Sequence, residues 1–216
     1  MQKKLATILK PDPGMKGKNQ YNIRSLYFDD MENSALCQKE AGIFRRKKYR
    51  IRMYNRCDSV VKFERKTKIG ALMLKECVQI SRTEAEKLIA RDFNFLAKAD
   101  NNLLRDFFLE TKCKLMRPVA IVEYDREAYI HPIGNVRVTF DTYLRIGHDL
   151  SAFFDSDDRS MSVMDQRGII LEVKYTDVLP QVISGLFPNT IRPQQAIGKF
   201  VLCRAQQISQ SGSSFY

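Results

Sequence analysis

The stretch KKYRIRMYN, residues 47–55, alternates cations with apolar side chains. Lys48, Arg50 and Arg52 occupy every second position, and aromatic or aliphatic residues stand between them. Because side chains two apart in a β-strand lie on one face, the pattern predicts a strand with one cationic and one apolar face. By itself this pattern is also typical of an ordinary antiparallel sheet that has one face on helices and the other in water.

Four further segments alternate in the same way. Their polar-face residues are Lys62, Glu64 and Lys66 in 60–66, Tyr124 and Arg126 in 122–128, Arg137, Thr139 and Asp141 in 136–141, and Glu172 and Lys174 in 170–174. Solvated faces usually mix Ser, Thr, Lys and Glu loosely, whereas here Arg and Lys recur from strand to strand. If the sheet closes into a barrel with its apolar faces outward against helices, its interior is a cationic tunnel.

Such a tunnel needs an anionic occupant, because closely packed cations repel one another. Triphosphate or polyphosphate fits, since Arg forks match phosphate oxygens and Lys supplies mobile charge. The carboxylates have two possible roles. Glu64 and Asp141 are expected to form ion pairs with neighbouring cations, whereas Glu172, beside Lys174, is open between an ion pair and a divalent metal site.

The charge composition restricts the classes of binding partner that are expected. The 216-residue chain carries 36 Lys and Arg against 25 Asp and Glu, and its net charge of +11 favours an anionic partner. Nucleic acid is not expected, because stacking aromatics should interleave with the cations, and Tyr49 and Phe63 fall on the opposite face. A membrane-surface role would place basic residues along an amphipathic helix, whereas here they are concentrated on strands.

Five scattered cysteines with no C-x-x-C pair indicate neither a disulfide framework nor a zinc site. The sequence also lacks an apolar run of about 20 residues and a signal peptide. We therefore expect a cytoplasmic protein with no transmembrane segment in this chain.

The rest of the chain predicts a single α+β domain over residues 1–216. A further strand is expected at 72–80, and residues 148–167 are expected to form a mobile surface loop. Ser81 and Glu84 have the spacing of a capping box at a helix start. Helices are expected at 2–10, 31–42, 81–99, 101–116, 177–187 and 193–208, the last starting at Pro193.

Several short segments of the sequence, taken together, resemble those of a known protein family. The segments that carry the resemblance, within residues 21–204, are IRSLYFDD, KYRIRMYN, FERKTK, MLKE, RPVAIVEYDREAY, NVRVTFDT, ILEVKY and GKFVLC. In this order and spacing they resemble the polyphosphate polymerase domain of the vacuolar transporter chaperone (VTC) type, in the CYTH-like triphosphate tunnel superfamily. The similarity is greatest to bacterial members.

The resemblance implies an antiparallel tunnel barrel that transfers the terminal phosphoryl group of ATP to polyphosphate with Mn²⁺ or Mg²⁺. It implies that Glu172 binds the metal, with Lys174 beside it. It also implies that Lys199 contacts phosphate from the last helix. The other implied phosphate-binding residues are Arg50, Arg52, Lys66, Lys75, Arg126 and Arg137.

Two departures from the family pattern bear on activity. Relatives usually begin with a strand of the type Arg-x-Glu-x-Lys-Tyr, which is not found here, so one tunnel wall and one phosphate ligand are expected to be missing. Gly198 stands where relatives commonly have Ser, which removes a hydroxyl donor. Three functions therefore stay open: a polyphosphate-synthesising transferase, a tunnel-type triphosphatase, and a non-catalytic polyphosphate or nucleotide sensor. The triphosphatase would normally carry Glu-x-Glu-x-Lys, which is absent from the sequence.

Overall fold

An antiparallel sheet of nine strands forms the body of the molecule in this computed structural model. The structure describes residues 2–155, 160–165, 167–187 and 197–210. The main strand order is β5-β4-β3-β2-β6-β7-β8, with β1 paired to β6 and β9 paired to β7. The strands are β1 Lys10–Pro11, β2 Tyr21–Asp29, β3 Arg45–Tyr54, β4 Cys57–Ile69, β5 Leu72–Ile80, β6 Arg117–His131, β7 Val136–Gly147, β8 Met161–Ser162 and β9 Ile169–Lys174.

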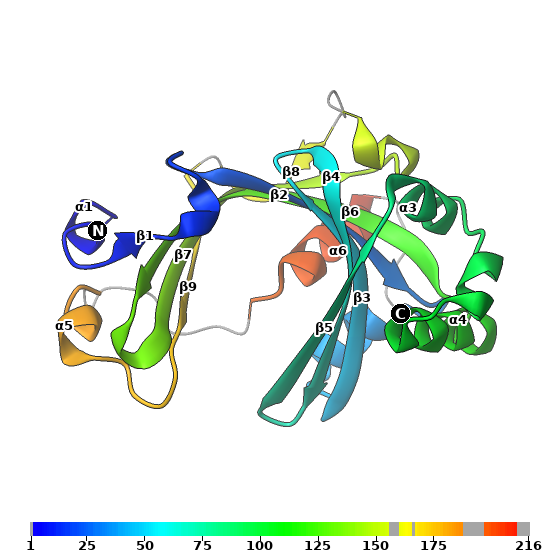
Figure 1. The fold of residues 1–216 in the computed structure, drawn as a ribbon, viewed down its shortest axis with the longest axis horizontal. Helices are drawn as coiled ribbons and strands as arrows, with labels where there is room; N and C mark the ends of the chain where they lie inside the picture. Colours follow the sequence, from blue (N-terminus) through cyan, green and yellow to red (C-terminus); the bar gives the residue numbers. More distant parts are fainter. Residues whose placement is uncertain (1, 156–159, 166, 188–196, 211–216) are drawn as a thin grey trace.

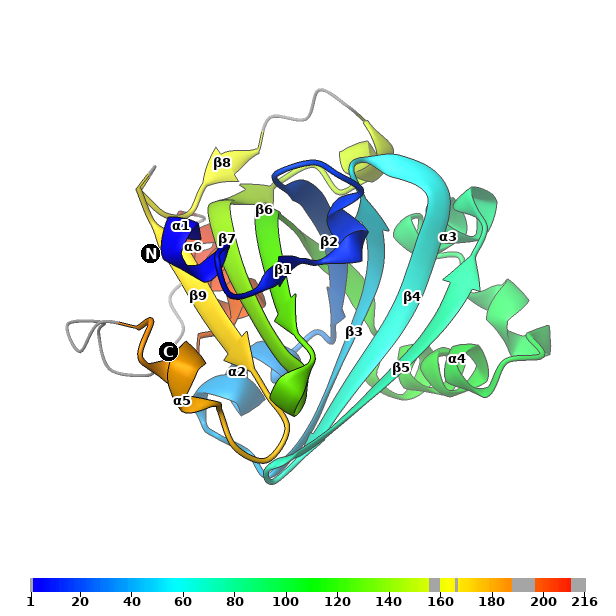
Figure 2. The ribbon, with the colours of Figure 1, turned by 60° about the vertical axis from the view of Figure 1, so that its left-hand side comes forward.

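The sheet curves into an open arch (Figures 1 and 2). The α+β class and the antiparallel sheet are confirmed, but the barrel is not closed. Within the described residues β5 pairs only with β4, and β9 only with β7. In Figure 1 these two strands belong to opposite arms of the arch, so no hydrogen-bonded ladder joins the two edges.

Four of the six described helices cover the outer face of the arch, as predicted. The helices are α1 Gln2–Leu5, α2 Ser34–Glu40, α3 Arg82–Ile89, α4 Asn102–Lys114, α5 Gln181–Ser184 and α6 Lys199–Gln210, with 3-10 turns at Pro13–Met15, Asn94–Lys98, Ile133–Asn135 and Ser151–Phe154. The outward side chains Tyr49 and Phe63 pack against Phe107 of α4 with tilted rings. Ser81 and Glu84 form the predicted capping box at the start of α3. On the other arm, α1 and α5 pack against β7.

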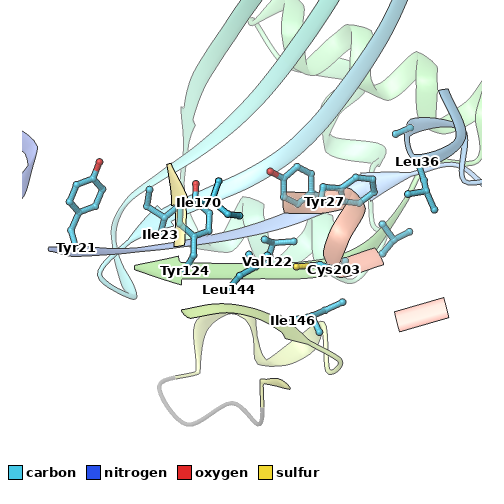
Figure 3. Packing of buried hydrophobic residues seen from close by; sticks show 14 of the residues in the cluster. Tyr21, Ile23, Tyr27, Leu36, Val122, Tyr124, Leu144, Ile146, Ile170 and Cys203 are labelled. Atoms are coloured by element: carbon cyan, nitrogen blue, oxygen red, sulfur yellow. The ribbon is translucent and has the colours of Figure 1, made fainter. Parts of the chain in front are cut away.

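Helix α6 departs from the prediction that helices lie outside, because it packs on the concave side together with α2. Phe200 and Cys203 of α6 share a buried cluster with Tyr27, Val122 and other inward side chains of β2 and β6. Figure 3 shows Cys203 gathered with these residues. The reason is the composition of this part of the inward face: Tyr27, Val122 and Ile170 make it apolar, so it needs cover.

Several predicted boundaries change. Only the segment Gln2–Leu5 is helical in the predicted helix 2–10, and α5 is a single turn. The predicted helix 81–99 breaks after Ile89 into a 3-10 turn. Pro193 lies outside the described residues, and α6 begins at Lys199. In the predicted surface loop 148–167, Ser151–Phe154 form a 3-10 turn whose Phe153 is buried against the outer core, and residues 156–159 and 166 lie outside the described residues.

The described helices include none with the length and apolar character needed to cross a bilayer.

Candidate functional site

The candidate site is the concave face of the arch, formed by the inward side chains of β2, β3, β4, β5, β6, β7 and β9. The register between β3 and β4 places Arg50 opposite Glu64 and Lys48 opposite Lys66. The register between β6 and β7 places Arg126 opposite Asp141. The alternation predicted from sequence therefore brings the cations of separate strands onto one surface.

The first group on this face is the Glu64 cluster, consisting of Glu64, Arg50 and Lys75. Arg50 Nε lies 2.7 Å from Glu64 Oε2, and Lys75 Nζ lies 2.7 Å from Glu64 Oε1. Arg50 Nη1 also donates to the Tyr27 hydroxyl at 2.9 Å. Burial alone would raise the pKa of Glu64, but Arg50, Arg52 and Lys75 outweigh it and lower the pKa to about 2. One buried carboxylate thus binds two cations.

The second group is the Asp141 cluster, consisting of Asp141, Arg126 and Lys199. Arg126 binds the carboxylate in a two-pronged arrangement, with Nε 2.6 Å from Oδ1 and Nη2 2.7 Å from Oδ2. Lys199 Nζ lies 2.6 Å from Oδ2 and 4.9 Å from the Tyr124 ring centroid. Burial opposes ionisation of Asp141, but the two cations lower its pKa. This cluster also binds two cations to one buried carboxylate.

Arg52 and Lys66 contribute positive charge that is not neutralised by an ion pair within the described part of the chain. Arg52 Nε donates to Ser25 Oγ at 3.0 Å, and Nη2 lies 3.5 Å from the Tyr124 hydroxyl. The pKa of Lys66 is lowered, first by desolvation and then by Lys174 and Arg50. Lys66 belongs to β4 and Lys174 to β9, so both of these strands contribute cations to the concave face.

Glu172 is the most accessible carboxylate of the predicted set. Its side chain is 39% exposed, whereas those of Glu64 and Asp141 are almost fully buried. Lys174 Nζ lies 3.3 Å from one carboxylate oxygen, and Arg126 Nη2 lies 3.9 Å from the other. Burial alone would raise the pKa of Glu172, but Lys174, Lys199 and Arg126 lower it. The carboxylate is therefore ionised and reachable from the concave side.

A metal held by several protein ligands does not fit this face. Nowhere in the described ranges do three His, Cys, Asp or Glu residues come together in a metal-binding arrangement. The oxygens of Glu64 and Asp141 already face two cations each. Of the three predicted carboxylates, Glu172 is the one that offers an accessible oxygen, which suits an ion such as Mg²⁺ that takes one or two carboxylates and completes its shell with water and phosphate.

Two predicted cations stand apart from the clusters. Arg137 lies near the start of β7. Its Nη2 atom lies 2.8 Å from Asp12 Oδ2 and 3.1 Å from the Tyr21 hydroxyl. Lys48 lies 4.8 Å from the Phe200 ring centroid, and desolvation lowers its pKa to about 8. Both residues face inward, but neither joins the Glu64 or the Asp141 cluster.

Tyrosine hydroxyls line the concave face; the sequence analysis assigned Tyr124 to this face but missed Tyr21 and Tyr27. The Tyr21, Tyr27 and Tyr124 hydroxyls each lie within 3.5 Å of a different inward arginine. Burial opposes ionisation of Tyr27, yet Arg50, Arg52 and Lys48 lower its pKa to about 8. The available signal was the two-residue alternation of β2, which places Tyr21, Ser25 and Tyr27 on one side.

A separate ionic network lies on the outer face and has a structural role. Buried Glu123 binds Arg24, Arg56 and Arg145, at distances between 2.7 and 3.2 Å. It ties β2, β6 and β7 together behind the candidate site. Removing one member of such a buried ionic network destabilises the fold, because it leaves an uncompensated buried charge.

Comparison with known proteins adds a family match. The model described as VTC domain matches residues 1–208, and no curated protein matches. Among solved structures, the PH1819 protein from Pyrococcus horikoshii OT3 is similar with a TM-score of 0.39 and 13% identity, over 86% of this chain and 76% of that one. A Bacillus halodurans structure, provisionally described as an adenylate cyclase, gives a TM-score of 0.43 and 13% identity, over 70% and 76% of the chains. The family match includes every strand of the concave face.

Proposed function

The chain belongs to the VTC domain family, and on that premise we propose that its concave face binds ATP and polyphosphate and transfers the terminal phosphoryl group of ATP to the polyphosphate chain. One observation carries the proposal: two buried carboxylates on this face each bind two cations, and Arg52 and Lys66 have no carboxylate partner among the described residues. The face is therefore positively charged even after its ion pairs are counted. A phosphate chain is the complementary ligand.

The carboxylates Glu64 and Asp141 orient the cations that would touch phosphate. Each holds an arginine through at least one short charge-assisted bond, so the guanidinium enters binding with little rotational freedom left to lose. Arg52 lies between the clusters on the floor of the arch, held by Ser25. In this arrangement the arginines fix the phosphate chain and stabilise the charge that develops in the transition state.

Phosphoryl transfer on this face needs no protein nucleophile. An oxygen of the polyphosphate end attacks the γ-phosphorus of ATP, the bond from that phosphorus to the bridging oxygen breaks, and ADP leaves with the electron pair. The chain's own contribution is to align the two phosphate groups and to neutralise their mutual repulsion.

Glu172 is the residue that would hold a divalent cation, Mn²⁺ or Mg²⁺, with phosphate and water as the remaining ligands. When bound, such an ion neutralises charge on the phosphate oxygens. Lys174 and Arg126 keep the Glu172 carboxylate ionised beside the phosphate site.

Hydrolysis is the second candidate, and the open arch favours it. A closed tunnel excludes water from the reacting phosphate, whereas in the described residues no ladder joins the edges of β5 and β9, so backbone pairing does not seal this side against water. In that case water replaces the polyphosphate end as the attacking group.

The test is incubation with ATP and Mn²⁺, followed by separate assays for polyphosphate, for free phosphate and for ATP binding. Polymer formation supports the transferase and phosphate release the hydrolase, whereas binding without turnover assigns a sensor role. We expect Glu172→Gln to lower metal-dependent turnover far more than polyphosphate binding, and Arg50→Ala to lower both. Equal loss of binding in the two variants would contradict the role of Glu172, and absence of binding and reaction would refute the proposal.

A further inference from the structure

The far end of the β4–β5 hairpin exposes a group of large apolar side chains. We call this group the apolar tip; it consists of Ile43, Phe44, Ile69, Leu72, Met73 and Leu74. Leu72 is 77% exposed and Phe44 is 69% exposed. Figure 1 shows the hairpin and the adjoining start of β3 projecting below the rest of the molecule. Soluble surfaces carry single exposed apolar residues, but a contiguous group marks an interaction site.

The apolar tip is an ordered part of the sheet. Ile69 pairs with Leu72 across the turn. The Gly70 amide donates to the Phe44 carbonyl at 2.9 Å, which ties the hairpin to β3. The Phe44 ring fills the space beside Gly70, where an added Cβ would lie 2.7 Å from a ring carbon. The exposed side chains therefore have a fixed platform, and their exposure is a property of the fold.

The arrangement of the apolar tip indicates what covers it. Leu72, Met73 and Leu74 are consecutive residues of a strand, so they point alternately to the two faces of the hairpin. A protein surface docked against one face would leave the other face in water. An apolar medium that surrounds the end of the hairpin covers both faces, and the interface of a lipid bilayer is such a medium.

Cations flank the apolar tip. They form a basic collar, consisting of Arg45, Arg46 and Lys68. Arg45 pairs with Ile69, and Lys68 pairs with Met73 and Arg46, so these cations lie directly beside the apolar side chains in the sheet. Basic side chains next to inserted apolar groups lie at the depth of the headgroups, where they attract anionic lipid.

We propose that the apolar tip inserts into the interface of an anionic lipid bilayer, with the basic collar against the headgroups. This peripheral attachment is independent of what the concave face binds. It differs from the helix-based attachment considered from the sequence, because the amphipathic element is the end of a hairpin.

The absence of tryptophan from the sequence allows a direct test. Leu72→Trp introduces a single fluorophore at the tip, and Val178→Trp is its matched control, since Val178 is 76% exposed but lies outside the tip. With vesicles of equal parts phosphatidylcholine and phosphatidylglycerol, we expect a blue shift and quenching by brominated lipid for Leu72→Trp only. No shift at Leu72→Trp, an equal shift in both variants, or a shift that depends on protein concentration without lipid would overturn the proposal.

A second measurement separates tip insertion from attachment through the cationic concave face. The triple variant Phe44→Ser, Leu72→Ser, Leu74→Ser keeps the net charge, and we expect it to lower vesicle co-sedimentation about tenfold. The control triple variant Ile133→Ser, Val178→Ser, Val182→Ser changes residues that are also more than half exposed, and it should bind like the wild type. Unchanged vesicle binding of the tip variant would overturn the proposal.

Discussion

Lys199 Nζ, in the first residue of α6, lies 2.6 Å from Asp141 Oδ2 on β7. This ion pair joins the last helix to the sheet, although 58 positions separate the two residues in the sequence. The same carboxylate holds Arg126, so the pair brings cations from α6 and β6 to one point on the concave face. The last helix is therefore a part of the candidate site as well as its apolar cover.

Replacing Lys199 with Met should lower tripolyphosphate affinity about tenfold or more, because a charge-assisted contact contributes about 1.5–3 kcal/mol. Arg126 still pairs with Asp141 in the variant, so the fold should persist. Isothermal titration measures the change. The control is Lys114→Met, which removes a lysine paired with Glu110 on the outer helix α4. Equal affinities for the two variants would exclude Lys199 from the site.

Glu64→Gln should lower the free energy of unfolding by about 3 kcal/mol, because Arg50 loses its buried counter-ion. Bound tripolyphosphate can supply the missing negative charge, so the ligand should stabilise this variant more than the wild type. Urea unfolding with and without tripolyphosphate measures both effects.

The matched control for Glu64→Gln is Glu76→Gln on the outer side of β5. Glu76 pairs with Arg65, which keeps Asp106 as a second partner. Glu76→Gln should lower the free energy of unfolding by less than about 1 kcal/mol. Tripolyphosphate should stabilise this variant no more than it stabilises the wild type. If the two variants respond alike to tripolyphosphate, Glu64 has no connection with the binding face.

Binding of long polyphosphate should weaken as pH rises through about 8. Lys48 and Tyr27 both have a pKa of about 8. Above that pH the free face loses the positive charge of Lys48 and gains the negative charge of the Tyr27 phenolate, and internal phosphates of a long chain keep their charge. Lys48→Arg keeps its charge and should flatten the profile between pH 7 and 9 (about one unit either side of these pKa values). Identical profiles for variant and wild type would contradict this explanation.

Gly198→Ser should be accommodated and should strengthen phosphate binding. A Cβ on Gly198 would meet Val201 Cγ2 at 3.4 Å and Lys39 Cε at 3.8 Å, which are ordinary contacts. The hydroxyl would lie next to Lys199 at the start of α6, where a serine can also cap the helix. Tripolyphosphate titration and thermal unfolding measure the two effects. Unchanged phosphate affinity in a variant that folds normally would show that no phosphate approaches this helix start.

The strand pattern could be predicted from the sequence because its physical signal is local. Alternation in residues 47–55 placed Arg50 and Arg52 on one face, and the structure confirms both the strand and the face. The ion pairs expected for Glu64 and Asp141 are also confirmed. In each case the partner lies directly opposite in a neighbouring strand, so strand pairing and side-chain alternation are sufficient to predict the ion pair.

The remaining features depend on contacts between distant segments. Nothing local in α6 distinguishes packing on the concave side from packing outside, since both need one apolar stripe. The choice follows from the apolar inward residues Tyr27 and Val122, which belong to other strands. Closure of the sheet likewise depends on the relation of β5 to β9, which alternation within a strand does not specify.

The central claim is that the concave face binds a phosphate chain, and titration of tripolyphosphate into wild type and Arg52→Gln tests it most directly. Arg52 lies on this face without a carboxylate partner in the described residues, so its loss breaks no ion pair. The control is Arg82→Gln, on the outer helix α3. We predict saturable binding that weakens about tenfold or more in Arg52→Gln and is unchanged in Arg82→Gln. No binding by the wild type, or equal weakening in both variants, would contradict the claim.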